Sequence, residues 1–306
     1  MEKTLYDIAI IGGGPAGLSA GLYAARGGAK TAVFESVFTG GQIVKTTHLD
    51  NYPGFPEGID GYSFGAKLEQ QAKNAGTEIR FTEVVSISLD GPIKILELAD
   101  GTAEAKAVIL CTGATPRKLG VPGEETFTGA GVSYCATCDG PFFRNKKVAV
   151  VGGGDTAVAD ALYLADVAEE VILIHRRDEL RAAEVLAKAA KNNEKIRFCW
   201  DSVPVEVLGD GIVSGIRVRN VKTDAVTDIP VSAVFAAVGV VPETALFHDA
   251  VELNGYGAVK TDAGMRTSLP FVYAAGDVRE TPLRQVVTAC ADGAVAAMTA
   301  LSDLKR

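Results

Sequence analysis

Two cysteines, Cys135 and Cys138, enclose Ala136 and Thr137 in the stretch GVSYCATCDGPFF. A CxxC pair in a chain with few cysteines is either a redox dithiol or half of a zinc site. Zinc needs two further ligands at a similar local spacing. None of the other cysteines or histidines forms such a pair; these are Cys111, Cys199, Cys290, His48, His175 and His248. The spacing therefore favours a redox dithiol over zinc and over two unrelated buried cysteines.

An acidic residue, Asp139, directly follows the second cysteine. Reduction of a disulfide produces two sulfur atoms whose protons must come from a neighbouring group, and a carboxyl group can supply them. The alternative is a turn or capping residue, because aspartate is common in both positions. We expect proton transfer.

Glycines near the N-terminus follow a second pattern of known chemistry. Gly12 allows a tight turn, Gly14 lets the backbone approach a pyrophosphate, and Gly17 lets a helix pack closely on a strand. Glu35 ends the next apolar segment, 23 residues after Gly12. A carboxylate there accepts hydrogen bonds from a ribose 2′-hydroxyl and repels a 2′-phosphate. FAD or NAD fits this pattern, whereas NADP does not.

The same pattern recurs 140 positions later, with Gly152 and Gly154 in the places of Gly12 and Gly14. Ala157 replaces Gly17, and His175 replaces Glu35. Three arginines follow the histidine closely; they are Arg176, Arg177 and Arg181. Guanidinium groups match a phosphate in geometry and charge, so this cluster predicts selection of the 2′-phosphate of NADP. The alternative is a solvated helix start with scattered salt bridges.

The elements that position these residues are two β-α-β units, over residues 7–35 and 147–175. The stretches FCWDSVPVEVL and GIVSGIRVRNV predict further strands, and residues 284–306 predict a helix too apolar on one face to stand alone. We therefore expect an α/β fold with two Rossmann-like dinucleotide-binding domains, the second inserted within the first. The expected parts are residues 1–115 and 247–306 for one domain and 116–246, with the CxxC pair, for the other.

Composition narrows the function classes. The 306 residues include 30 basic and 38 acidic side chains, a net charge of −8, which argues against nucleic acid as the main partner. Five cysteines predict no disulfide framework. We find no run near the ~20 apolar residues that a membrane helix needs and no signal peptide. The expectation is a cytoplasmic protein without membrane association.

The order of these motifs resembles the low-molecular-weight thioredoxin reductases along essentially the whole chain. The matching stretches are GGGPAGLSA, TGGQ, NYPG, YCATCDG, GGGDTAV, HRRDELRA, AAGD and RQVVTA. The resemblance implies a homodimeric flavoenzyme in which NADPH reduces FAD, FAD reduces the Cys135–Cys138 disulfide, and the dithiol reduces thioredoxin. It also implies that Cys138 faces the flavin, that Cys135 exchanges with the partner and that Asp139 donates the proton.

The resemblance places the FAD contacts on Gly12, Gly14, Pro15, Ala16, Gly17, Glu35, Gly41, Gln42, Asn51, Gly276, Asp277, Arg284, Gln285 and Val286. It places the NADPH contacts on Gly154, Asp155, Thr156, His175, Arg176, Arg177 and Arg181. Several positions depart from the family pattern, among them Ala159, Val240, Pro141 and Cys290. Ala159 stands where many relatives carry glutamate, and Val240 stands where histidine is common.

Four alternative functions share part of this pattern. Relatives that take electrons from ferredoxin, or that run in reverse as dithiol oxidases, lack the arginine cluster that this chain has. A disulfide reductase with NADH as donor is a further variant. A non-catalytic, NADP-sensing flavoprotein would not need the two cysteines.

Overall fold

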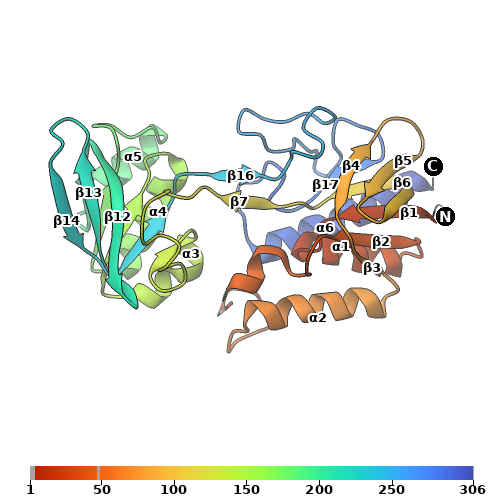
Figure 1. Ribbon diagram of the computed structural model, residues 1–306, viewed down its shortest axis with the longest axis horizontal. Helices are drawn as coiled ribbons and strands as arrows, with labels where there is room; N and C mark the ends of the chain where they lie inside the picture. The colour runs from red at the N-terminus through yellow and green to blue at the C-terminus, as the bar shows by residue number, and fades with distance from the viewer. Residues whose placement is uncertain (1–3, 47–48, 306) are drawn as a thin grey trace. The chain divides into compact units, whose positions relative to one another are not determined.

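The computed structural model describes residues 4–46 and 49–305 of the chain. It divides into two compact units (Figure 1), unit 1 with residues 1–115 and 241–306 and unit 2 with residues 116–240. The second boundary therefore lies before the expected Leu246, and residues 241–246 group with unit 1. Two short strands carry the chain between the units and pair with each other, β7 (Ala114–Pro116) and β16 (Val240–Pro242).

Unit 1 is built on a sheet with the order β3-β2-β1-β6-β5-β4, and β17 also pairs with β6. The strands β1, β2, β3, β6 and β17 pair in parallel, whereas β4 and β5 form an antiparallel extension. The bounds are β1 Thr4–Ile11, β2 Thr31–Glu35, β3 Glu78–Phe81, β4 Val84–Ser88, β5 Lys94–Leu98, β6 Gly101–Leu110 and β17 Val272–Ala274.

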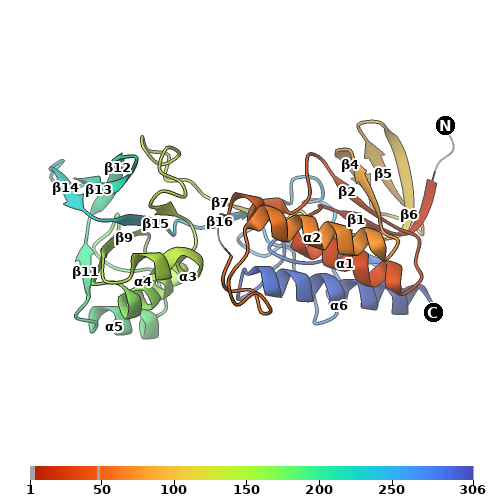
Figure 2. The same ribbon diagram turned by 90° about the horizontal axis from the view of Figure 1, so that it is seen from below.

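Three helices cover one face of this sheet, with α1 (Pro15–Arg26) between α2 (Gly61–Asn74) and α6 (Val286–Leu304), as Figure 2 shows. Proline stands in the first turn of α1, where its missing N–H costs nothing. Asp60 caps α2 by accepting a hydrogen bond from the Ser63 N–H (2.8 Å). A short 3-10 helix, η1 (Gly41–Lys45), precedes α2. The alternation of side chains along β1 separates two cores, with Ile8 and Ile10 on the helix side.

Unit 2 contains a second sheet with the order β11-β10-β9-β15-β8, in which every pair is parallel. Its strands are β8 Val132–Ser133, β9 Lys147–Val151, β10 Glu170–Ile174, β11 Ile196–Cys199 and β15 Ala233–Ala236. Helices pack on one face, and they are α3 Ala136–Asp139, η2 Gly140–Phe143, α4 Asp155–Val167 and α5 Glu184–Lys191. An antiparallel meander packs on the other, with β12 Ser202–Asp210, β13 Ile212–Asn220 and β14 Val226–Pro230.

Both predicted β-α-β units are present, as β1-α1-β2 and β9-α4-β10, so the expectation of two Rossmann-like domains is confirmed. The C-terminal helix α6 packs against α1, where a Cβ on Gly293 would collide with the backbone of Ala16. By length and composition α6 would also suffice to span a membrane, which corrects the expectation that no segment does. Its small apolar side chains belong to the core of unit 1, and a core helix meets the same criterion.

Candidate active site and dinucleotide sites

The first glycine turn joins β1 to α1 and has the backbone that its sequence requires. Gly12 has a φ of 105°, and a Cβ there would collide with the carbonyl oxygen of Cys111. A Cβ on Gly17 would collide with the Gly12 carbonyl, so α1 lies directly on the turn. Gly14 precedes α1 without a side-chain cap, and a Cβ on Gly14 would lie 3.9 Å from the Gly41 Cα. Because the first N–H groups of α1 have no capping side chain, the turn fits a phosphate.

The Glu35 carboxylate lies over this turn. Its Oε2 accepts a hydrogen bond from the Gly13 N–H (2.8 Å), and its Oε1 accepts one from the Val37 N–H (3.2 Å). The carboxylate retains acceptor capacity because each ionised oxygen can accept about two hydrogen bonds. The end of β2 therefore places a negative acceptor beside the glycine turn, as the sequence predicted.

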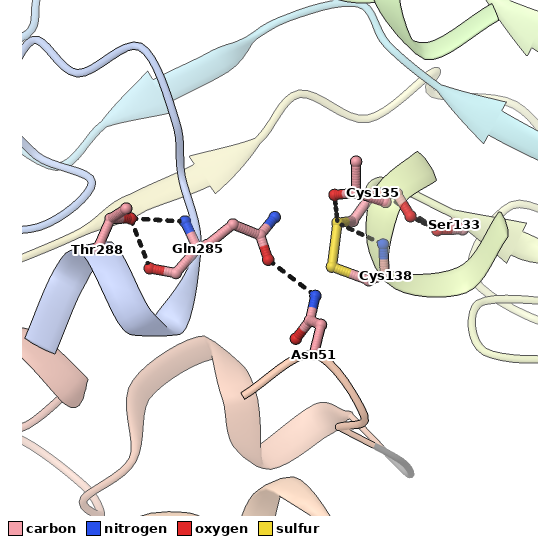
Figure 3. The surroundings of a disulfide bond; sticks show 7 residues. Asn51, Ser133, Cys135, Cys138, Gln285 and Thr288 are labelled. Carbon is pink, nitrogen blue, oxygen red and sulfur yellow. Dashed lines mark hydrogen bonds between the residues drawn. A yellow bond between two sulfur atoms is a disulfide. The ribbon is translucent and has the colours of Figure 1, made fainter. Parts of the chain in front are cut away.

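A second group of predicted contacts comes from the C-terminal part of unit 1. The Asn51 amide donates to Gln285 Oε1 (3.0 Å), and Gln285 is the residue that precedes α6 (Figure 3). Burial raises the pKa of Asp277, an effect that Arg284 opposes and Asp292 increases. Arg284 Nε is buried without a hydrogen-bond partner among the described residues. An orphaned buried donor of this kind fits a site that is completed by a bound group.

Other predicted residues of unit 1 lie around the same turn. Gly41 approaches Gly14, since a Cβ on Gly41 would lie 3.1 Å from the Gly14 Cα. Pro15 and Ala16 form the first turn of α1, and the side chain of Gln42 is exposed. The Gly276 N–H donates to Asp292 Oδ2 (3.2 Å), and Val286 begins α6.

The second glycine turn, in unit 2, joins β9 to α4. Gly152 has a φ of 154°, and a Cβ there would collide with Ala157, the residue in the place of Gly17. Gly154 precedes α4 without a side-chain cap and has open space where a Cβ would be. Asp155 Oδ1 accepts a hydrogen bond from the Ala183 N–H (2.7 Å), whereas Thr156 is exposed. This turn also fits a phosphate.

His175 takes the place of Glu35 in unit 2 but is buried. Its ring lies so close to Gly153 that a Cβ there would collide with it, and its Nε2 has no hydrogen-bond partner among the described residues. Burial lowers the pKa of His175, and the charges of Arg181, Arg176 and Arg177 lower it further. The imidazole is therefore held neutral, with one polar atom left for a ligand or water.

The three arginines of the cluster are exposed, and none has an ion-pair partner in residues 4–46 and 49–305. The Arg181 N–H donates to the Gly153 carbonyl oxygen (2.8 Å), so the chain after β10 returns to the glycine turn. This contact brings Arg181 next to the turn, together with Arg176 and Arg177 at the end of β10. The geometry presents positive charge beside an uncapped helix N-terminus, which suits a phosphorylated ribose.

Cys135 and Cys138 form a disulfide with Cα atoms 5.3 Å apart (Figure 3). Cys135 caps α3, because its Sγ accepts a hydrogen bond from the Cys138 N–H (3.2 Å). Ser133 Oγ accepts from the Cys135 N–H (3.1 Å), which fixes the chain entering the helix. Asp139 ends α3, and its N–H donates to the Cys135 carbonyl oxygen (3.1 Å). In the described part of the chain no group of three or more His, Cys, Asp or Glu could hold a metal ion.

Similarity to known proteins agrees with this chemistry. The sequence pattern of the pyridine nucleotide-disulphide oxidoreductase family matches residues 6–293. Thioredoxin reductase of Peptoclostridium acidaminophilum is 46% identical over 97% of this chain and 96% of its own length. The crystal structure of thioredoxin reductase from Streptococcus pyogenes covers 99% of both chains with a TM-score of 0.92 and 44% identity. The chain belongs to the thioredoxin reductases.

A bifunctional thioredoxin reductase/thioredoxin of Mycobacterium leprae is 44% identical over 98% of this chain and 66% of its own length. As a thioredoxin reductase, the chain is a flavin-dependent and pyridine nucleotide-dependent disulfide oxidoreductase. The Cys135–Cys138 disulfide fits the redox centre of such an enzyme. The prediction of a redox dithiol is therefore confirmed.

Proposed function

We propose that this thioredoxin reductase binds FAD in unit 1, binds NADPH in unit 2 and transfers two electrons through the Cys135–Cys138 pair to thioredoxin. The observation that carries the proposal is the disulfide at the start of α3. The chain also has two glycine turns, before α1 and α4, that have no capping side chain and differ in the charge of the side chains beside them. When bound, the flavin supplies a two-electron carrier between nicotinamide and disulfide. All further steps depend on residues of this chain.

The proposed FAD site uses the glycine turn before α1, Glu35 and the segment before α6. Glu35 would bind the ribose hydroxyls, because its carboxylate already lies over the turn and accepts from Gly13. The unpartnered Nε of Arg284 and the Asn51–Gln285 pair would complete the site. The remaining proposed contacts are Gly12, Gly14, Pro15, Ala16, Gly17, Gly41, Gln42, Gly276, Asp277 and Val286.

The proposed NADPH site uses the glycine turn before α4 and the arginine cluster. Arg176, Arg177 and Arg181 would bind the 2′-phosphate as charge-assisted hydrogen-bond donors. The remaining proposed contacts are Gly154, Asp155, Thr156 and His175. Asp155 also accepts from the Ala183 N–H, which links the glycine turn to the segment that follows Arg181.

The proposed dithiol chemistry balances as follows. The reduced Cys135 sulfur attacks one sulfur of the thioredoxin disulfide, which breaks that bond and forms a mixed disulfide. Cys138 then attacks the Cys135 sulfur, releases thioredoxin as a dithiol and re-forms the Cys135–Cys138 bond. Two electrons and two protons pass to thioredoxin. Asp139, next to Cys138, would supply and recover the proton at the enzyme dithiol.

We further propose a homodimer in the cytoplasm without membrane association or nucleic-acid partner. The proposed flavin is identified by denaturing the protein and separating the released chromophore by chromatography, which distinguishes FAD from FMN. Light scattering during gel filtration measures the mass of the assembly, and cell fractionation locates it. A monomer of native activity would contradict the dimer.

Reduction by reduced ferredoxin or NADH in preference to NADPH, or electron transfer from the dithiol to oxygen, would favour the alternative functions.

A further inference from the structure

A buried carboxylate outside the described site, Glu124, is hydrogen-bonded to Tyr134, the residue directly before Cys135. Its side chain belongs to the turn after β7, and the residue is 1% exposed. Its Oε1 accepts hydrogen bonds from the Leu119 N–H (2.7 Å) and from the Tyr134 hydroxyl (2.8 Å), and its Oε2 accepts one from the Gly120 N–H (2.7 Å). A buried carboxylate with three donors costs far less than an unpaired one, so the cluster is a stable unit.

The Glu124 carboxylate joins two segments, the one that follows β7 and the one that leads into Cys135. Leu119 and Gly120 follow the strand β7 that carries the chain into unit 2. Tyr134 is the residue directly before Cys135 and packs with Leu119 in the core under the meander. Burial and, to a smaller extent, the hydrogen bond to Glu124 raise the pKa of Tyr134 to about 12.

The redox turn has further contacts within unit 2. Ser133 holds the backbone N–H of Cys135, β8 pairs with β15 over Val132 and Ser133, and Ala136 is buried in the core with α4. The Tyr134 hydroxyl adds a polar contact directly before Cys135, and this contact ends on a carboxylate that is itself fixed to the backbone. The Cα separation of 5.3 Å between Cys135 and Cys138 is suitable for a disulfide.

We propose that Glu124 is a positioning residue that acts through Tyr134, holding Cys135 where it closes on Cys138 and tying the redox turn to the strand that enters unit 2. The proposal rests on the function proposed above. Loss of the tether lowers the effective concentration of one thiol at the other. The Cys135–Cys138 disulfide then becomes easier to reduce, and the dithiol becomes a weaker reductant of thioredoxin.

The test measures the equilibrium between disulfide and dithiol in buffers of reduced and oxidised dithiothreitol, with alkylation of free thiols and mass spectrometry as the readout. Tyr134→Phe removes the hydroxyl and leaves both backbone contacts of Glu124 in place. We expect the equilibrium constant for disulfide formation to fall on the order of fivefold, which is the effect of one hydrogen bond. Glu124→Gln, which keeps the volume, should shift the equilibrium in the same direction.

A matched control removes the same kind of contact elsewhere. Tyr273→Phe deletes a buried hydroxyl of unit 1 that donates to Asp303 Oδ2 (3.0 Å), with a similar cost in stability. It should leave the dithiothreitol equilibrium unchanged. No shift in Tyr134→Phe, or an equal shift in Tyr273→Phe, would overturn the proposal. The readout needs neither flavin nor NADPH, so failure of the native enzyme to reduce thioredoxin would contradict the proposed function separately.

Discussion

The Glu35 carboxylate accepts a hydrogen bond from the Gly13 N–H, and the equivalent place in unit 2 holds His175 against Gly153. The two halves of an internal repeat thus share a backbone and differ in charge at one position. The proposed function requires that the acidic position repel a 2′-phosphate and that His175 with its arginine neighbours accept one. This difference is the physical basis for the proposed division of FAD and NADPH between the units.

We expect the arginine pair to determine the choice of nucleotide. Arg176→Ala combined with Arg177→Ala should raise the KM for NADPH on the order of ten- to a hundredfold, because hydrogen bonds between charged groups are lost. The KM for NADH should change little. Steady-state kinetics with both nucleotides measure the ratio, and Arg219→Ala, an exposed arginine of the meander, is the control. Equal losses for NADPH and NADH would refute the assignment.

The two cysteines should differ in their reaction with thioredoxin. The Cys138 N–H donates to Cys135 Sγ, a contact that stabilises a thiolate on Cys135. Cys138→Ser should therefore form a covalent complex roughly tenfold faster than Cys135→Ser. The substrate is thioredoxin with one active-site cysteine activated by thionitrobenzoate, and release of thionitrobenzoate gives the rate. Cys199→Ser is the control, and the opposite order of rates would reverse the proposed roles.

A buried ion pair supports the segment between β17 and α6. Asp292 Oδ2 accepts from Arg279 Nε (2.7 Å) and from the Gly276 N–H; Asp292 is buried, and Arg279 is mostly buried. Asp292→Ala leaves Arg279 buried without its partner, so the free energy of unfolding should fall by about 3–5 kcal/mol. Urea unfolding measures it. Asp228→Ala, which breaks an exposed pair with Arg217, should change it little. Similar losses of unfolding free energy in both variants would contradict the expectation that the buried pair contributes more than the exposed one.

The pH dependence of stability should report on Asp160 in α4. Burial raises its pKa from 3.8 to about 6, so the folded protein binds more protons than the unfolded chain between these values. Stability therefore falls as pH rises through this window. Asp160→Asn should gain about 2–3 kcal/mol over the native protein between pH ~4 and pH ~7. Urea unfolding at both pH values checks this, with exposed Asp166→Asn as the control. A pH-independent difference would contradict the assignment.

Much of the fold could be predicted because its signals are local. The conformation of the turn at Gly12 is determined by a few neighbouring residues, and the spacing from Gly12 to Gly17 and Glu35 is that of one β-α-β unit. The cysteine pair needs no tertiary information either. Helix α2, the strands β3 to β6 and the boundary at Val240 were not predicted. The pairing of β3 with β2 and of β6 with β1 joins segments distant in the sequence, whereas the β4–β5 and β5–β6 hairpins are local and were missed.

The positioning part of the site could not be predicted in the same way. Glu124 stands in an ordinary turn sequence, and nothing in its spacing to Tyr134 indicates that a carboxylate will be buried against three donors. The unpartnered Nε of Arg284 is likewise a property of the folded chain. Such contacts arise from packing between segments, which periodicity does not encode.

In the proposed function, electrons pass from NADPH to thioredoxin through one flavoprotein chain. The most direct measurement is an anaerobic titration of the purified protein with NADPH and, separately, NADH, followed by addition of oxidised thioredoxin. We predict that NADPH bleaches the flavin absorbance at lower concentrations than NADH and that thioredoxin restores it. The Cys135→Ser protein should be bleached without being restored. Failure of both nucleotides to bleach the flavin, or recovery that is independent of the cysteines, would contradict the account.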